Sequence, residues 1–194
     1  MGVSFGGLQA IQVAVHAVQL APLLVLHSCA PSGLPYPDSI AERLAVPVAF
    51  SPTAQRATWA AVRRLVASDR GLARMMTSLS SVPIDRWWAS WSSRERELAR
   101  STFRSMDSGS GFGNDVRQAS AKLTSYRTAA QRAVACPTLI TASRFDGGVA
   151  YAHAENFAAT IRHATVVDTQ APSHFYWIGQ PRKRVAAAVA SFLS

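Results

Sequence analysis

Residues 2–7 read Gly2-Val3-Ser4-Phe5-Gly6-Gly7, and this stretch decides the predicted fold. It matches the pattern G-x-S-x-G and leads into a predicted helix over Gly7–Gln19, where apolar residues recur every three to four positions. In such a strand-to-helix turn the serine sits on a strained backbone, and the glycines let strand and helix approach closely. Ser4 is therefore a candidate nucleophile, and the Phe5 N–H a candidate oxyanion donor. The pentapeptide alone fits an ordinary strand-to-helix turn equally well.

Three short apolar runs are predicted to be strands of a parallel sheet: Leu23–Ser28, Thr138–Ser143 and Ala164–Asp168. The first run suits a strand that is buried on both faces. Helices are predicted after the last two, over Ala152–Ile161 and Arg184–Leu193. This alternation of strands and helices is typical of parallel βαβ units and predicts the α/β class.

Polar residues follow the predicted strands where they end. Asp146 comes just after the second strand and His174 a few residues after the third, while Ser4 begins the chain at another strand end. The carboxyl ends of parallel strands meet at one edge of the sheet, so the three side chains are expected to face the same edge. The order serine, acid, histidine is that of a catalytic triad on an α/β sheet. Asp168 and His27 are weaker candidates, because both lie within predicted strands, and His27 is expected to be a core histidine.

The sequence between the first two predicted strands has a different composition and periodicity. Residues 31–52 are rich in Pro and Ser and are predicted to be a loop. Helical patterns follow until about residue 134, and they are interrupted by a Gly/Ser segment, residues 108–114, that either forms a hinge or links two helices. The predicted helices cover Thr53–Ser68, Asp69–Leu79, a segment after Pro83, a segment from Ser93, and Asp115–Arg132. The predicted organisation is a core over 1–30 and 136–194 with a helical insertion over 31–135.

Three tryptophans of the insertion are candidate substrate-binding residues. Trp87, Trp88 and Trp91 have a spacing that suits an apolar pocket wall. The same spacing suits packing of the insertion itself, and the sequence leaves both interpretations open.

The sequence resembles the α/β-hydrolase superfamily. The resemblance rests on Gly2–Ala10, on Leu24-Val25-Leu26, on Cys136–Ile140, on Asp146–Val149 and on Ser173-His174-Phe175. It implies the C-terminal part of a hydrolase sheet with an inserted helical cap, and a triad of Ser4, Asp146 and His174 with Phe5 in the oxyanion hole. It implies hydrolysis of an ester, a lactone or a related acyl substrate, without a cofactor or a metal ion. The serine at position 4 argues against the dehalogenase branch, which has an acidic residue there.

The chain departs from the family by starting at the nucleophile. The family has further strands and a second oxyanion donor upstream, so we expect a truncated gene or a misplaced start codon. About three strands would then remain, and the chain alone is expected to be inactive and poorly soluble. A catalytically inactive fragment or a non-enzymatic binding module is the alternative function.

Composition sets further limits. The chain has 194 residues, is 48% apolar and 16% charged, and carries a net charge of +9. Its positive charge is almost all arginine, scattered over helical segments, so a nucleic-acid or membrane partner is not expected, although a basic module that binds RNA or anionic membrane stays open. No basic segment precedes the apolar run near residue 20, as a signal peptide would require, so we expect a cytoplasmic protein. Cys29 and Cys136 are predicted to be free thiols, because they would lie a strand length apart. The expected partner is a small acyl substrate, and the sequence does not indicate the oligomeric state.

Overall fold

A computed structural model describes residues 1–37, 39–109 and 111–194. The strands are β1 (Gly2–Val3), β2 (Leu24–His27), β3 (Thr138–Ala142) and β4 (Ala164–Asp168). The α-helices are α1 (Gly6–His16), α2 (Ile40–Ala49), α3 (Gln55–Leu65), α4 (Asp69–Thr77), α5 (Ser93–Ser105), α6 (Gly111–Gln118), α7 (Thr124–Arg132), α8 (Ala152–Thr160) and α9 (Pro181–Leu193). Short 3-10 turns occupy Val18–Leu20, Ile84–Arg86, Trp88–Ser90 and Ala121–Leu123. None of the helices in these ranges is long and apolar enough to span a membrane.

The described strands form one parallel sheet in the order β1-β2-β3-β4. The strand predicted at Ala164–Asp168 is confirmed to the residue, β3 ends one residue before the predicted Ser143, and β2 is one residue shorter at each end than predicted. All residues of β2 and β3 are buried, as expected for strands covered on both faces. The two-residue β1 pairs Gly2 with Leu26 and Val3 with His27, so part of the β2 edge that was expected to be open is covered.

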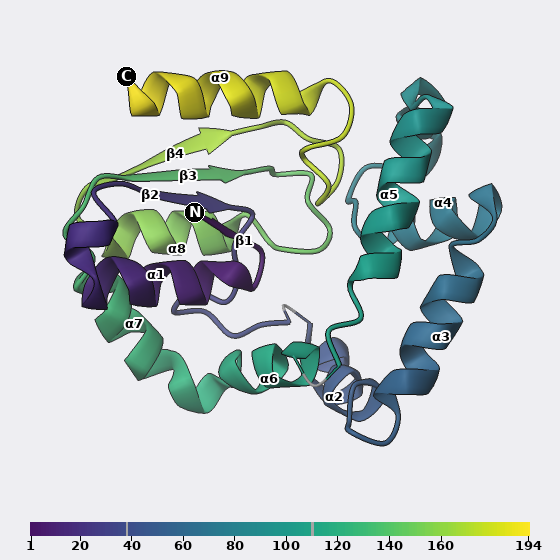
Figure 1. Ribbon diagram of the computed structural model, residues 1–194, viewed down its shortest axis with the longest axis horizontal. Coiled ribbons are helices and arrows are strands. Elements are labelled where there is room, and N and C mark those ends of the chain that lie inside the picture. Colours follow the sequence, from purple (N-terminus) through teal and green to yellow (C-terminus); the bar gives the residue numbers. More distant parts are fainter. Residues whose placement is uncertain (38, 110) are drawn as a thin grey trace.

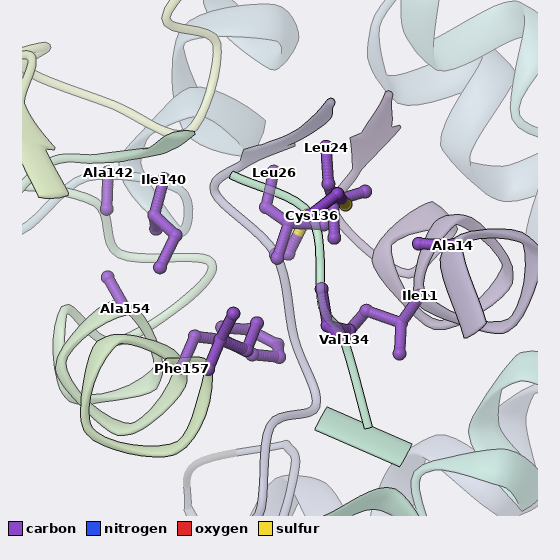
Figure 2. Close-up of a cluster of buried hydrophobic side chains, with 12 residues drawn as sticks. Ile11, Ala14, Leu24, Leu26, Val134, Cys136, Ile140, Ala142, Ala154 and Phe157 are labelled. Carbon is purple, nitrogen blue, oxygen red and sulfur yellow. The ribbon is translucent and has the colours of Figure 1, made fainter. Parts of the chain in front are cut away.

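Helices cover both faces of the sheet. Helix α9 lies on one face, and α1 and α8 lie on the other, with α7 outside them (Figure 1). The main core fills the space between the sheet and α1 and α8. Figure 2 shows Ile11 of α1 and Phe157 of α8 directed toward side chains of β2 and β3. Burial of this apolar surface is the main force that holds these layers together.

The insertion between β2 and β3 runs from α2 to α7. Helices α3, α4 and α5 lie beyond the carboxyl ends of the strands, while α7 packs against α1 and α8 (Figure 1). The N-terminus of α5 is capped on both sides, because Ser92 and Glu95 make a capping box. A second core surrounds the fully buried Leu72 and Met76, and Phe175 and Ile178 from the loop after β4 are part of it.

Parts of the insertion differ from the sequence-based prediction. The predicted loop over 31–52 contains α2, which begins at the N-cap Ser39, whose hydroxyl accepts from the Glu42 N–H. The predicted helix Asp115–Arg132 is divided into α6, a 3-10 turn and α7. The predicted hinge is helical from Gly111 onward, while its Ser110 lies outside the described residues.

Candidate active site

Ser4 lies at the sharp turn that joins β1 to α1. Its backbone φ is +51°, a left-handed conformation that side-chain-bearing residues adopt only when their surroundings enforce it. The Ser4 N–H donates to the His27 carbonyl at 3.0 Å, which ties the turn to the end of β2. The side chain is partly exposed. This is the geometry that presents a serine hydroxyl above the edge of a sheet.

The glycines around Ser4 have different roles. A Cβ atom on Gly2 would lie 2.7 Å from the Gly6 carbonyl oxygen, and a Cβ atom on Gly7 would lie 2.7 Å from the Cys29 side chain. A Cβ atom on Gly6 would meet nothing within 4 Å. The close approach of strand and helix therefore requires Gly2 and Gly7. The motif predicts this role for Gly2 and Gly6, the two glycines that flank Ser4.

The backbone N–H of Phe5 is available as a donor. Phe5 is the N-cap of α1, and its N–H has no acceptor among the described residues. Because the N-terminal N–H groups of a helix point outward and carry partial positive charge, this position suits an anion that forms on a group attacked by Ser4.

Asp146 lies in the loop after β3 and is almost completely buried. Its Oδ1 atom accepts from the N–H groups of Gly148, at 2.7 Å, and Val149, at 3.0 Å. Its Oδ2 atom lies 2.8 Å from Nδ1 of His174. These contacts fix the carboxylate and leave one oxygen directed at the histidine.

His174 lies in the loop after β4 and is also buried. With Asp146 as an ionised acceptor, Nδ1 carries the proton and Nε2 is left with a lone pair. Nε2 makes no hydrogen bond to the part of the chain that the structure describes. A Cβ atom on Gly148 would lie 3.2 Å from the imidazole ring, so the acid loop also packs against the histidine. The arrangement can accept a proton at Nε2 while the carboxylate stabilises the resulting imidazolium.

The three predicted residues share one edge of the sheet. The loops after β3 and β4 bring Asp146 and His174 together, and Ser4 follows β1 at the same carboxyl edge. Val3 packs against the cluster that contains Tyr176, two residues after His174. No hydrogen bond joins the Ser4 hydroxyl to His174 within residues 1–37, 39–109 and 111–194. In structures without substrate this contact is often long.

The competing residues lie elsewhere. Asp168 ends β4, where its carboxylate accepts from the Gln170 N–H and faces Arg144. His27 is buried within β2, and its Nδ1 lies 2.6 Å from the Thr141 hydroxyl. Burial lowers the pKa of His27 to about 4, so it is a neutral core histidine, as predicted. Cys29 and Cys136 are free and buried, and burial raises the pKa of the Cys29 thiol to about 12.

The predicted tryptophans lie in the core of the insertion. Trp87 and Trp91 are buried in one cluster with Phe103 and Phe175, and the ring of Trp88 is tilted against that of Trp91. The segment forms short 3-10 turns rather than the predicted α-helix. Their contacts are those of packing residues. The cluster also contains Phe175, which follows His174 in the sequence.

Two aromatic residues that the sequence did not single out lie against the turn at Ser4. The ring of Phe5 makes edge contacts with Tyr36, at 5.1 Å between centroids, and with Phe112, at 5.8 Å. Tyr36 also donates to the carbonyl of Gly148 in the acid loop, at 2.9 Å. Tyr36 lies in a proline-rich loop, and no periodic pattern in the sequence marks it as a site residue.

The described residues contain no group of three His, Cys, Asp or Glu side chains that could hold a metal ion.

The known proteins to which the chain is similar include hydrolases. No protein-family model matches the sequence. The chain is 26% identical over 195 residues to the uncharacterized hydrolase YcgS of Bacillus subtilis (strain 168), a match that covers 100% of this chain and 67% of the relative. It is similar in structure to a hydrolase from Pseudomonas aeruginosa PA01, with a TM-score of 0.67, 21% identity, and coverage of 100% of this chain and 63% of the other. It is also similar to the enol-lactonase from Burkholderia xenovorans LB400, with a TM-score of 0.67, 17% identity, and coverage of 99% and 64%.

The parallel sheet, its helices and the likeness to these solved structures show that the chain has an α/β-hydrolase fold. This is the fold that the sequence resemblance predicted. The chain spans slightly less than two thirds of the length of the two solved structures.

Proposed function

We propose that the chain is the triad-bearing part of a serine hydrolase that acts on an ester, a lactone or a related acyl substrate. The observation that carries this proposal is the buried pair of Asp146 and His174, 2.8 Å apart, at the sheet edge where Ser4 has a φ of +51°. A buried carboxylate and histidine beside a strained serine are the parts that nucleophilic acyl transfer requires.

The proposed reaction begins with Ser4. Its hydroxyl oxygen attacks the substrate carbonyl carbon while Nε2 of His174 takes the hydroxyl proton, and the Phe5 N–H donates to the oxyanion. The tetrahedral intermediate collapses, and the leaving alkoxide takes the proton from His174. A water molecule, deprotonated by His174, then attacks the acyl-enzyme, and Ser4 regains its proton as the acid product leaves. Asp146 keeps the imidazole in the required tautomer throughout.

The substrate is proposed to lie against Phe5, under the helical insertion acting as a cap. Tyr36 and Phe112 contact Phe5 next to the nucleophile, which favours an apolar group on the substrate. The tryptophans at 87, 88 and 91 stay a second candidate group, because they belong to the cluster that contains Phe175, the residue after His174. The likeness to an enol-lactonase supports the inclusion of lactones among the substrates.

The alternative is an α/β-hydrolase chain without activity. It is favoured by the absence of a hydrogen bond between Ser4 and His174 in the described residues. In that case the same fold would serve only as a binding module.

Turnover of p-nitrophenyl esters and of simple lactones distinguishes the two functions. From the sequence alone we expected an inactive chain, but β1 is present, pairs with β2 and leads directly to Ser4. We therefore expect turnover by the unmodified chain and a loss of several orders of magnitude in kcat for Ser4→Ala. Ser78→Ala is the matched control, because the Ser78 hydroxyl donates only to Met75 within its own helix end. Turnover that persists in Ser4→Ala, or no turnover in the unmodified chain, would contradict the proposal.

A further inference from the structure

The segment Leu79–Val82 of the insertion, just after α4, reaches both loops of the candidate site. The carbonyl oxygen of Leu79 accepts from the Gly147 N–H at 3.1 Å and from the His174 N–H at 2.9 Å. One carbonyl therefore joins the loop that carries the acid to the loop that carries the histidine.

The same segment pairs with the acid loop as a short antiparallel bridge. Ser80 lies opposite Asp146, and the Ser81 N–H donates to the Phe145 carbonyl at 2.9 Å. This pairing fixes the backbone of Asp146 from the side opposite to its carboxylate contacts with Gly148 and Val149.

The Ser80 side chain extends these contacts to the histidine loop. Its hydroxyl proton is shared between the carbonyl oxygens of Pro172 and Val82, and its oxygen accepts from the Val82 N–H at 3.0 Å. Pro172 lies two residues before His174, so the hydroxyl holds the start of the turn that delivers the imidazole.

The acid loop is shaped to receive this segment. A Cβ atom on Gly147 would lie 2.5 Å from the Ser80 nitrogen and 2.9 Å from the Leu79 carbonyl carbon. Both neighbours are backbone atoms, which cannot rotate away as a side chain can. The residue after the acid therefore has to be a glycine for the segment to lie this close.

We propose that Ser80 is a positioning residue, which holds the Asp146–His174 pair in register with Ser4 through the histidine loop. The inference rests on the proposed hydrolase function. It follows from the contacts above, because the segment is the one part of the insertion seen to bond both loops, and because a displacement of about 1 Å at a reacting group can lower a rate by about 100-fold.

Kinetics of three variants test this role. We expect Ser80→Ala to lower kcat for a p-nitrophenyl ester by roughly 10- to 100-fold with little change in KM, since the Ser80 hydroxyl is engaged with backbone groups of Val82 and Pro172. Ser80→Thr keeps the hydroxyl and is expected to restore most of the rate. Ser78→Ala removes a nearby hydroxyl that bonds neither loop, and it is expected to match the unmodified chain.

The ring tautomer of His174 gives a second readout that does not depend on activity. With 15N-labelled histidine, long-range proton–nitrogen correlation spectra at alkaline pH report which ring nitrogen is protonated, and His174→Gln assigns the signal. We expect the Nδ1–H form in the unmodified chain and in Ser80→Thr, and a mixture of tautomers in Ser80→Ala. If the proposed function is wrong, no Ser4-dependent turnover will be seen. The tautomer of His174 in Ser80→Ala then shows by itself whether Ser80 positions the ring. An unchanged tautomer together with unchanged kcat in Ser80→Ala would overturn the proposal, as would an equal loss in Ser80→Ala and Ser80→Thr.

Discussion

The Nδ1 atom of His174 lies 2.8 Å from the Oδ2 atom of Asp146, across 28 residues of sequence, and both side chains are buried. A hydrogen bond of this kind is strengthened in a buried setting, because little water competes for it. It fixes which ring nitrogen can accept a proton, and Asp168 makes no comparable contact.

Asp146→Asn is expected to lower kcat by roughly four orders of magnitude, the size of the effect in a serine protease triad, because an amide favours the wrong histidine tautomer. The measurement is steady-state hydrolysis of a p-nitrophenyl ester. Asp168→Asn is the matched control, since Asp168 ends the neighbouring strand and faces Arg144. A larger loss of kcat in Asp168→Asn, at unchanged stability, would exchange the two roles.

His27 makes the stability of the fold depend on pH. Its pKa falls from 6.5 to about 4 on burial, so the unfolded chain takes up a proton before the folded chain does. The stability contribution is fully present above pH 6.5 and is lost as the pH falls toward 4, which amounts to about 3 kcal/mol. Urea unfolding at a series of pH values is expected to show this loss in the unmodified chain and a smaller loss in His27→Gln.

His16→Gln is the control for this experiment, because His16 lies at the exposed end of α1. The account of His27 fails if His27→Gln and the unmodified chain lose stability in parallel between pH 6.5 and 4.

Gln131 of α7 is a buried residue whose side-chain amide makes no visible hydrogen bond within the part of the chain that the structure describes. It is 1% exposed, and neither its Oε1 nor its Nε2 atom has a hydrogen-bond partner among the described residues. Gln131→Met keeps the length of the side chain and removes both polar atoms, so we expect the free energy of unfolding to rise by about 1–3 kcal/mol. Thermal and urea unfolding measure the change, with Gln118→Met on exposed α6 as the control. A clear destabilisation by Gln131→Met alone would show that these atoms have a partner, such as a buried water molecule.

The sequence predicted the central strands because their signals are local. Thr138–Ala142 and Ala164–Asp168 are runs of β-branched and apolar residues bounded by turn residues, and the first of them is buried throughout. The helix α2 was missed because Pro47 and the prolines before Ser39 suggest a loop. A signal for it was present, since Ser39 and Glu42 have the spacing of an N-terminal cap.

The candidate residues of the site were predicted from their side-chain type and from their position after the predicted strands. Asp146 and His174 each follow a strand, and parallel topology brings such positions together. The contribution of Leu79 and Ser80 could not be predicted, because the Leu79 contacts are made by its backbone carbonyl, whose partners depend on tertiary structure. The contact of Tyr36 with Phe5 was not predicted for a similar reason, since it depends on the path of an irregular loop.

The central claim is that Ser4 is a nucleophile activated by His174. The most direct measurement is labelling of the chain with a fluorophosphonate probe, followed by mass spectrometry of the labelled peptide. We predict one adduct, on Ser4, which is absent in Ser4→Ala and strongly reduced in His174→Gln, while Ser78→Ala labels like the unmodified chain. No adduct on Ser4 in a folded chain, or equal labelling in His174→Gln, would contradict the claim.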